Sequence, residues 1–191
     1  SSLIGKSLLD KFMIPYDDAK AVKVLKPVSE ESTMLRQTLA ANLLNCVKFN
    51  CDNGQKTFWA YEIGKTYTIE NVSDEKNTGV KETRVLAGIL TGEVENSKWQ
   101  VKTASDFFTV KGIVESLFNE LGVEKRIKLV SLDKSPLAKT HAILHPYRSA
   151  AINVLGKSMT TIGYFGQLHP LLKDNHLNRF PLLLVTVHPV V

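Results

Sequence analysis

The chain has 191 residues, of which 43% are hydrophobic and 23% charged, and its net charge at pH 7 is +5. Such a chain can bury a core as one large domain, or as a compact domain with an appendage, and it contains no low-complexity run. No apolar run approaches the roughly 20 residues that cross a bilayer, so we expect no membrane contact. The first nine residues lack the features of a signal peptide, and two cysteines cannot form a disulfide framework, so the cytoplasm is the expected compartment.

The positive charge is spread thinly along the chain. Lys20, Lys23 and Lys26 stand singly and are mixed with Asp17 and Asp18, whereas a nucleic-acid groove more often shows clustered lysine and arginine with interleaved aromatic residues. A solvated surface is the simpler interpretation. A modest contribution to RNA attraction within a larger assembly stays open.

The N-terminal part begins with weak helical spacing over residues 1–13. We interpret residues 1–20 as a helical lead-in from an upstream domain and residues 21–191 as the core domain. Residues 21–25 predict a short strand that stops before Pro27, because proline cannot donate to a sheet ladder.

The first strong helix signal is an apolar residue at every fourth position from Leu35 to Val47. It predicts an amphipathic helix that is capped by Thr38 or Ser32 and closes near residues 53–54. Cys46 widens the apolar stripe of this helix, so we interpret it as a core residue rather than as a nucleophile.

The middle and C-terminal parts alternate between strand and helix signals. The spacing of apolar residues predicts one further helix over residues 105–121, with Gly122 as its stop. Alternating or continuous apolar runs predict the strands, and polar stretches predict the loops. The predicted segments are strands at 56–69 (with a turn at Gly64–Lys65), 83–91, 126–132 and 181–187, a loop at 92–103, and a helical turn at 171–174.

A hairpin is the clearest strand signal, with alternating residues at 150–155 and 160–165. Gly156 and Lys157 offer the positive φ of a tight turn, although residues 157–160 also suit a longer loop. Pro146 and Pro170 are expected to mark the limits of the ladder. About seven strands with two good helices between them predict an α+β fold with a mostly antiparallel sheet.

Seven short motifs occur in one order along nearly the whole chain. They are Pro27–Glu31, Leu35–Leu39, Tyr61–Lys65, Leu86–Gly92, Asp106–Phe108 with Lys111–Gly112, His145–Pro146 with Arg148–Ala150, and Ile162–Gly163 with Gly166–Pro170. In this order they resemble the catalytic-like module of the β subunit of bacterial phenylalanyl-tRNA synthetase. The resemblance covers residues 21–190, and other β-subunit parts, such as the editing and anticodon-binding domains, have no counterpart in it.

The resemblance implies a class II aminoacyl-tRNA synthetase-like fold, with a mostly antiparallel sheet flanked by helices, but without the chemistry. Active members place an arginine two positions before a strand glutamate, where its planar fork holds a phosphate of ATP. Here Ala60 stands two positions before Glu62, and Arg179, the one arginine after Gly166, has no glycine near it. We therefore expect no catalytic residue, cofactor or metal in this chain, and ATP and Mg used by the holoenzyme.

The same resemblance implies a partner, the catalytic α subunit, in a heterotetramer that attaches phenylalanine to tRNA. The helix that begins at Leu35 would then combine core packing with docking of the α subunit. The expected interface residues are Leu35, Arg36, Leu39, Leu43 and Leu44. Contact with tRNA is expected through the holoenzyme, and the isolated chain is expected to pair with a second copy if its docking surface is left uncovered.

Polar residues at the ends of the hairpin suggest a vestigial pocket with a polar lining, for which hydrogen bonds that only stabilise the fold are the competing explanation. The residues of this pocket would be Glu62, His145, Arg148, Ser149 and His169. His141 and His145 have the spacing of two metal ligands on a helix, but Pro146 opposes a helix there. Two further functions stay open, an independently active class II ligase and a basic RNA-binding module.

Overall fold

The computed structural model describes residues 1–70, 78–96, 101–132, 143–156, 158–170 and 183–188. Its centre is a six-stranded sheet in the order β3-β4-β10-β9-β8-β7, in which all neighbours are antiparallel. The strands are β3 (Phe58–Ile69), β4 (Val80–Thr91), β7 (Ile127–Ser131), β8 (Leu144–Leu155), β9 (Met159–Leu168) and β10 (Leu183–Val187). The predicted α+β fold with an antiparallel sheet is confirmed.

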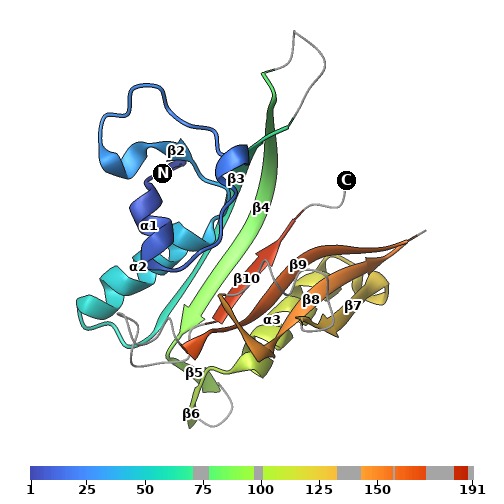
Figure 1. The fold of residues 1–191 in the computed structure, drawn as a ribbon. Coiled ribbons are helices and arrows are strands. Elements are labelled where there is room, and N and C mark those ends of the chain that lie inside the picture. The colour runs from blue at the N-terminus through green and yellow to red at the C-terminus, as the bar shows by residue number, and fades with distance from the viewer. Residues whose placement is uncertain (71–77, 97–100, 133–142, 157, 171–182, 189–191) are drawn as a thin grey trace.

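Three α-helices, three single-turn 3-10 helices (Asp18–Lys20, Glu30–Ser32 and Glu124–Arg126) and two small strand pairs complete the described chain. The α-helices are α1 (Lys6–Lys11), α2 (Ala40–Asp52) and α3 (Phe107–Glu120), and the pairs are β1 (Leu3–Ile4) with β2 (Met34–Leu35) and β5 (Glu93–Asn96) with β6 (Val101–Ala104). In Figure 1, α1 and α2 lie beside β3 and β4, and α3 lies against the other half of the sheet. No helix in the described ranges is long and apolar enough to cross a membrane.

The sheet has two apolar faces, because successive strand residues point to opposite sides. Tyr164 belongs to the core cluster that includes α1 and α2, whereas the next residue, Phe165, belongs to the cluster under α3. The Phe107 ring at the start of α3 stacks on Phe165 with centroids 5.3 Å apart. Helices α1 and α2 thus cover one face and α3 covers part of the other, while the edge strand β3 packs on the α2 side only.

Helix α2 begins later than the leucine spacing predicts. Leu35 pairs with Leu3 in a two-stranded ladder, and the helix starts at Ala40, whose amide donates to Thr38 Oγ1. The prediction for Leu35 was wrong because Leu3, far along the chain, fixes it as a strand residue. The end near Asn53 is confirmed, but the N-cap residue is Leu39, without a side-chain cap, so the expected cap by Thr38 or Ser32 was wrong. Cys46 is exposed, so its assignment to the core was also wrong.

Strand β3 runs without a break through Gly64, where a turn was expected. Its ladder with β4 continues residue by residue from Phe58 to Ile69. The expected loop at 92–103 also contains strand structure, the β5–β6 hairpin, and the expected strand at 21–25 is reduced to one bridge at Lys23. Short segments of this kind depend on partners that a local pattern does not specify.

Helix α3, strands β4, β7 and β10, and the β8–β9 hairpin are confirmed. Asp106 caps α3 through a capping box with Thr109, and Gly122 after it has φ +67. Gly156 does not take the expected positive φ, and Lys157 and the helical turn at 171–174 lie outside the described residues. Pro146 lies inside β8 and not at its limit. It is part of a bulge, in which residues 145–148 of β8 lie opposite the single residue Gln167 of β9.

The N-terminal segment packs on the same core as α2. Ile4, Leu9, Phe12 and Ile14 are all buried in the cluster that holds α2 and one face of the sheet. Their assignment to a lead-in from an upstream domain stays a prediction.

Candidate functional site

The five residues of the expected pocket lie in two separate places. Three of them, His145, Arg148 and Ser149, are on β8. His169 directly follows β9, and its amide donates to Ile143 O, just before β8, at 2.8 Å. Glu62 is on β3, with β4, β10 and β9 between it and β8. The structure therefore brings four of these residues to one end of the hairpin and leaves Glu62 apart from them.

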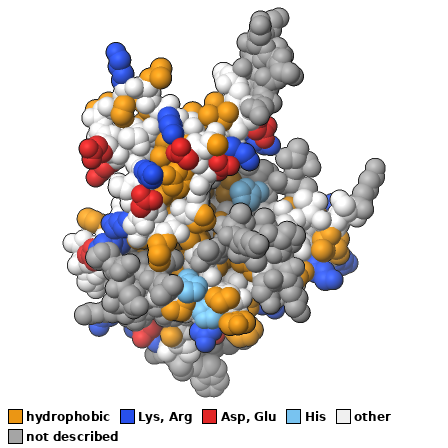
Figure 2. Space-filling view, viewed as in Figure 1, with side chains coloured by type: hydrophobic (Ala, Val, Ile, Leu, Met, Phe, Trp, Pro, Cys, Tyr) orange, Lys and Arg blue, Asp and Glu red, His pale blue; other side chains and the backbone are white. Residues whose placement is uncertain are grey.

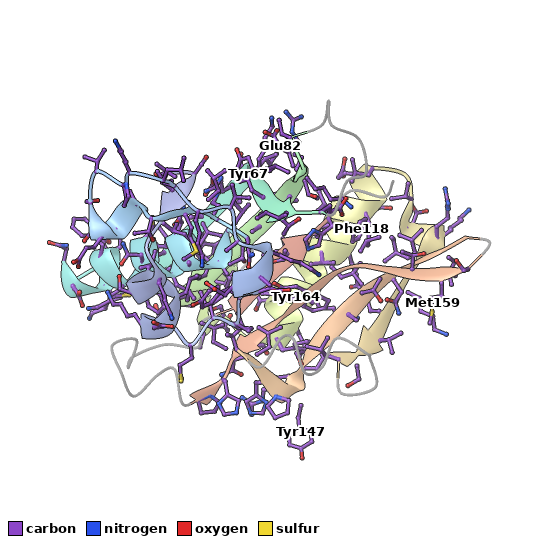
Figure 3. All side chains as sticks on the ribbon, turned by 45° about the horizontal axis from the view of Figure 1, so that its top comes forward. Tyr67, Glu82, Phe118, Tyr147, Met159 and Tyr164 are labelled. Atoms are coloured by element: carbon purple, nitrogen blue, oxygen red, sulfur yellow. The ribbon has the colours of Figure 1, made fainter. Side chains whose placement is uncertain are left out.

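Two hydrogen bonds stabilise the bulge of β8, residues 145–148, at this end of the hairpin. Arg148 Nη1 donates to Gln167 Oε1 at 3.0 Å, and the Tyr147 amide donates to His145 Nδ1 at 3.1 Å. The Tyr147 ring points away from the sheet (Figure 3). Ser149 is buried, and its hydroxyl has no hydrogen-bond partner among the described residues. A ligand role for the group stays a prediction.

Gly166 explains how Ser149 comes so close to β9. The two residues are opposite each other in the ladder. A Cβ on Gly166 would lie 2.6 Å from Ser149 Cβ, a distance at which one of the strands must move. A glycine inside a strand often marks such a close approach.

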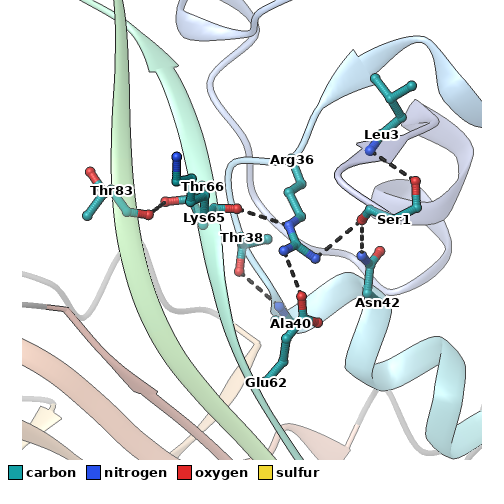
Figure 4. A network of polar contacts seen from close by, with 10 residues as sticks. All are labelled: Ser1, Leu3, Arg36, Thr38, Ala40, Asn42, Glu62, Lys65, Thr66 and Thr83. Atoms are coloured by element: carbon teal, nitrogen blue, oxygen red, sulfur yellow. Dashed lines mark hydrogen bonds and ion pairs between the residues drawn. The ribbon is translucent and has the colours of Figure 1, made fainter.

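Glu62 belongs instead to a buried polar network around Arg36 (Figure 4). Arg36 Nη2 lies 2.6 Å from Glu62 Oε1, Nε donates to Lys65 O at 3.0 Å, and Nη1 donates to Ser1 O at 3.2 Å. Gly64 leaves room for this ion pair, since a Cβ there would lie 2.8 Å from Glu62 Oε1. Each of the three guanidinium nitrogens thus has a protein partner, and Glu62 has a structural one.

The expected interface leucines belong mainly to the core of this chain. Leu39, Leu43 and Leu44 are at most 4% exposed, and Leu35 is half-buried. What α2 offers to a neighbour is formed by Asn45, Cys46 and Phe49, which are exposed. Contact of the leucines and Arg36 with another subunit stays a prediction.

A cavity of about 420 Å³ opens between the N-terminal segment and the sheet. Residues 14–17 form one wall, residues 37–39 another, and strands β3, β4, β9 and β10 the floor. Gln37 ties the walls together, because its Oε1 accepts from the Asp17 amide at 2.9 Å and its Nε2 donates to Asp17 O at 2.8 Å. Tyr164, on the floor, lies near the middle of the molecule (Figure 3).

The lining of this cavity is hydroxyl-rich and carries little charge. Thr66, Thr68, Tyr164 and Thr186 contribute hydroxyls, and Asp17 is the one carboxylate among the lining residues, which include no lysine or arginine. Burial raises the pKa of Tyr164, with an opposing effect from the Thr186 hydroxyl, so the phenol keeps its proton at pH 7. Desolvation lowers the pKa of His188, although its side chain is partly exposed.

Sequence reasoning missed this cavity. The signal was present as hydroxyl residues among apolar ones on several strands, but only the fold brings Thr66, Tyr164 and Thr186 into the lining of one cavity. Asp17 and Gln37 read as surface residues, and their mutual bonds form only when residues 14–17 cross the sheet. Among the described residues no group of three or more His, Cys, Asp and Glu is placed to hold a metal, and His141 lies outside them.

The outer face of β3 is apolar and exposed. Trp59, Tyr61 and Ile63 alternate along the strand and are 47%, 77% and 63% exposed. Phe58 and Ala60, at the even-numbered positions of the same strand, pack on the α2 side. The exposed three share a face with α3, which packs on β9 and β10. We call Trp59, Tyr61 and Ile63 the β3 ridge.

Several surface charges of the described part are neutralised by ion pairs. Six lysines of the described part form ion pairs with carboxylates: Lys20, Lys23, Lys48, Lys65, Lys81 and Lys111. Figure 2 shows basic and acidic side chains interspersed over the face in view. The positive net charge is therefore not gathered into a basic groove on the face shown.

Comparisons with known proteins agree with one another. The model of the family "Phenylalanyl tRNA synthetase beta chain CLM domain" matches residues 1–183. The chain is 33% identical over 155 residues to the phenylalanine–tRNA ligase beta subunit of Halalkalibacterium halodurans, with 81% of this chain and 18% of that protein covered. It is 34% identical over 161 residues to the corresponding subunit of Geobacillus kaustophilus, with 84% and 18% covered.

The fold is similar to that of Desulfitobacterium hafniense PylSc, a pyrrolysyl tRNA synthetase, with a TM-score of 0.61 and 16% sequence identity. The similarity covers 98% of this chain and 58% of that one. At this identity it shows the fold alone, and it confirms the expected class II synthetase-like architecture. The chain spans about a fifth of the length of the curated relatives that it matches.

Proposed function

The chain belongs to the family of the phenylalanyl tRNA synthetase beta chain CLM domain, and on that premise we propose that it is a non-catalytic module that docks and supports a catalytic α subunit. The assembly would be a cytoplasmic heterotetramer that attaches phenylalanine to tRNA(Phe). ATP and Mg would be bound by the α subunit, and tRNA would meet the holoenzyme. The relatives are named beta subunits, which supports a second kind of subunit as the partner.

The observation that carries the proposal is the identity of Ala60 on β3, where active synthetases place an arginine that holds a phosphate of ATP. Ala60 packs against the core. Arg36, the nearby buried arginine, is held by Glu62 and two backbone carbonyls. Loss of one preorganised charge that stabilises a transition state costs about a hundredfold or more in rate. This supports an inactive module over an independent ligase.

We place the docking surface on the β3 ridge. Large apolar side chains that gather on an exposed face commonly mark an interaction site. Aromatic residues are also enriched in the cores of protein interfaces, where charged residues are depleted. The ridge meets both conditions, whereas the ion-paired lysines give no support to a separate RNA-binding function.

Co-purification with the catalytic α subunit tests the proposal. The variant Tyr61→Asp/Ile63→Asp is expected to lose the complex because it places two charges at the centre of the ridge. Leu25→Asp/Val28→Asp is the matched control, since these apolar residues are fully exposed elsewhere and should leave the complex intact. Circular dichroism checks that both variants fold.

Two further readouts accompany this test. ATP–pyrophosphate exchange is expected in the complex and not with this chain alone; exchange by the chain alone would contradict the non-catalytic role. Without its partner, the wild-type chain is expected to dimerise through the ridge, which light scattering would detect. An unchanged complex in the ridge variant would place docking elsewhere.

A further inference from the structure

We propose that the cavity under residues 14–17 binds a small uncharged molecule that has an apolar body and one hydrogen-bonding group. This inference does not rest on the proposed function. It follows from the size of the cavity, from a buried hydroxyl that faces it, and from the charges of its lining.

The size is sufficient for a small organic ligand. The cavity measures about 420 Å³, within the range of roughly 300–1,000 Å³ that small-molecule sites occupy. Its walls are defined by side chains and by the two Gln37–Asp17 bonds, which fix residue 17 against the start of α2. A ligand would therefore meet a largely formed site.

The floor of the cavity contains a buried hydroxyl, that of Thr186, which can hydrogen-bond to a ligand. Thr186 is 3% exposed, lines the cavity, and its Oγ1 has no hydrogen-bond partner of good geometry among the described residues, although the Tyr164 hydroxyl is near. Buried polar atoms are nearly always hydrogen-bonded, so an exception at a cavity wall is informative. A ligand hydroxyl or carbonyl would supply the missing bond.

The lining selects against anions. A phosphate or carboxylate in the cavity would lose water and find no lysine or arginine among the lining residues. Burial of an unpaired charge is costly. Asp17, the one carboxylate of the lining, gives an anion no positive partner, and the hydroxyls of the floor are neutral. The remaining walls are apolar, with Ile14, Leu39 and Val85 among them, which suits the body of an uncharged ligand.

Two probes with the same body test the charge argument. Naphthol carries one hydroxyl on an apolar ring system, and naphthyl phosphate replaces that hydroxyl with an anion. Naphthol is expected to bind the purified chain, with amide shifts in nuclear magnetic resonance spectra confined to residues around the cavity. Naphthyl phosphate is expected not to bind there. Equal binding of the two probes, or binding of neither, would overturn the proposal.

Variants of the floor locate the site. Thr186→Val is expected to weaken naphthol binding about 3- to 10-fold, the typical effect of one hydrogen bond. Thr161→Val is the control, because Thr161 does not line the cavity and its hydroxyl donates to Asn153 Oδ1 at 2.7 Å, and it should leave the affinity within about twofold. Thr68→Trp should fill the cavity and abolish binding. Unchanged affinity in both Thr186→Val and Thr68→Trp would refute the assignment.

Discussion

The ion pair between Arg36 and Glu62 leads to a prediction about stability. The guanidinium is 5% exposed and the carboxylate 34%, with Arg36 Nη2 and Glu62 Oε1 2.6 Å apart. Removal of one partner of a fully buried pair costs about 3–5 kcal/mol, because the other charge stays buried. Glu62 is one-third exposed, and Arg36 keeps two carbonyl acceptors. Glu62→Ala is therefore expected to lower the free energy of unfolding by about 2–3 kcal/mol.

A double-mutant cycle separates the ion pair from simple packing. Urea unfolding would be followed by circular dichroism for Glu62→Ala, Arg36→Met and the double variant. Glu62→Ala should cost little in the Arg36→Met background, so the coupling energy should be about 2 kcal/mol. If Glu62→Ala costs the same in both backgrounds, the loss comes from strand packing and the reasoning fails.

An exposed ion pair on the same two strands is the control for this cycle. Lys65 and Glu82 link β3 to β4, and the side chain of each is about half exposed. Glu82→Ala should leave the free energy of unfolding almost unchanged, because solvent already screens that pair. A loss as large as that of Glu62→Ala would show that burial does not decide the difference.

Four other positions give predictions that the same unfolding measurements check. Gly166→Ala should lower the free energy of unfolding by about 1–3 kcal/mol, because the new Cβ pushes β9 away from Ser149. Ser149→Ala should be neutral or stabilise by up to about 1 kcal/mol, because it removes a buried hydroxyl that has no hydrogen-bond partner among the described residues. Asp106→Ala should cost about 1 kcal/mol through loss of the α3 cap, and Asp106→Asn much less; equal losses would contradict the cap. Burial raises the pKa of Tyr164 above its usual value of 10.0. The neutral phenol therefore contributes fully to the free energy of unfolding below about pH 10, and this contribution is lost as the pH rises through the pKa of the folded state. Tyr164→Phe should remove this loss of stability at alkaline pH.

The elements that the sequence predicts well carry their signals locally. Helix α3 has a capping residue, an apolar stripe and a terminal glycine within one segment, and the β8–β9 hairpin has alternation on both sides of a short connection. The predicted start of α2 was wrong because its signal is not local. Leu35 fits the helical spacing, but its pairing with Leu3 fixes it in a strand, and a local pattern contains no information about that pairing.

Gly64 shows why a correct observation led to a wrong element. Glycine inside a strand pattern is compatible with a turn or with the close approach of another group. The turn was the natural prediction beside Lys65. The structure shows close approach, by the guanidinium of Arg36 and the carboxylate of Glu62. The sequence supplied all three residues, but only the packing of residues 36–39 on β3 makes them one site.

The candidate site was predictable in its missing charges rather than in its shape. Ala60 in place of an arginine is visible in the sequence; Ala60 does not itself line the cavity, whose lining has no lysine or arginine. The cavity itself depends on residues 14–17 crossing the sheet and on Gln37 holding them there. A contact between two segments that are distant in the sequence leaves no periodic pattern, so sequence patterns do not reveal it.

The two surfaces proposed for binding lie on opposite sides of one strand. The β3 ridge is formed by odd-numbered residues such as Tyr61, and the cavity floor by even-numbered ones such as Thr68. A ligand that binds the folded chain stabilises it by mass action without touching the ridge. Naphthol should therefore raise the melting temperature of the Tyr61→Asp/Ile63→Asp variant as much as that of the wild type. If the ridge variant no longer responds to naphthol, the two faces of β3 are coupled, and docking and ligand binding are one event rather than two.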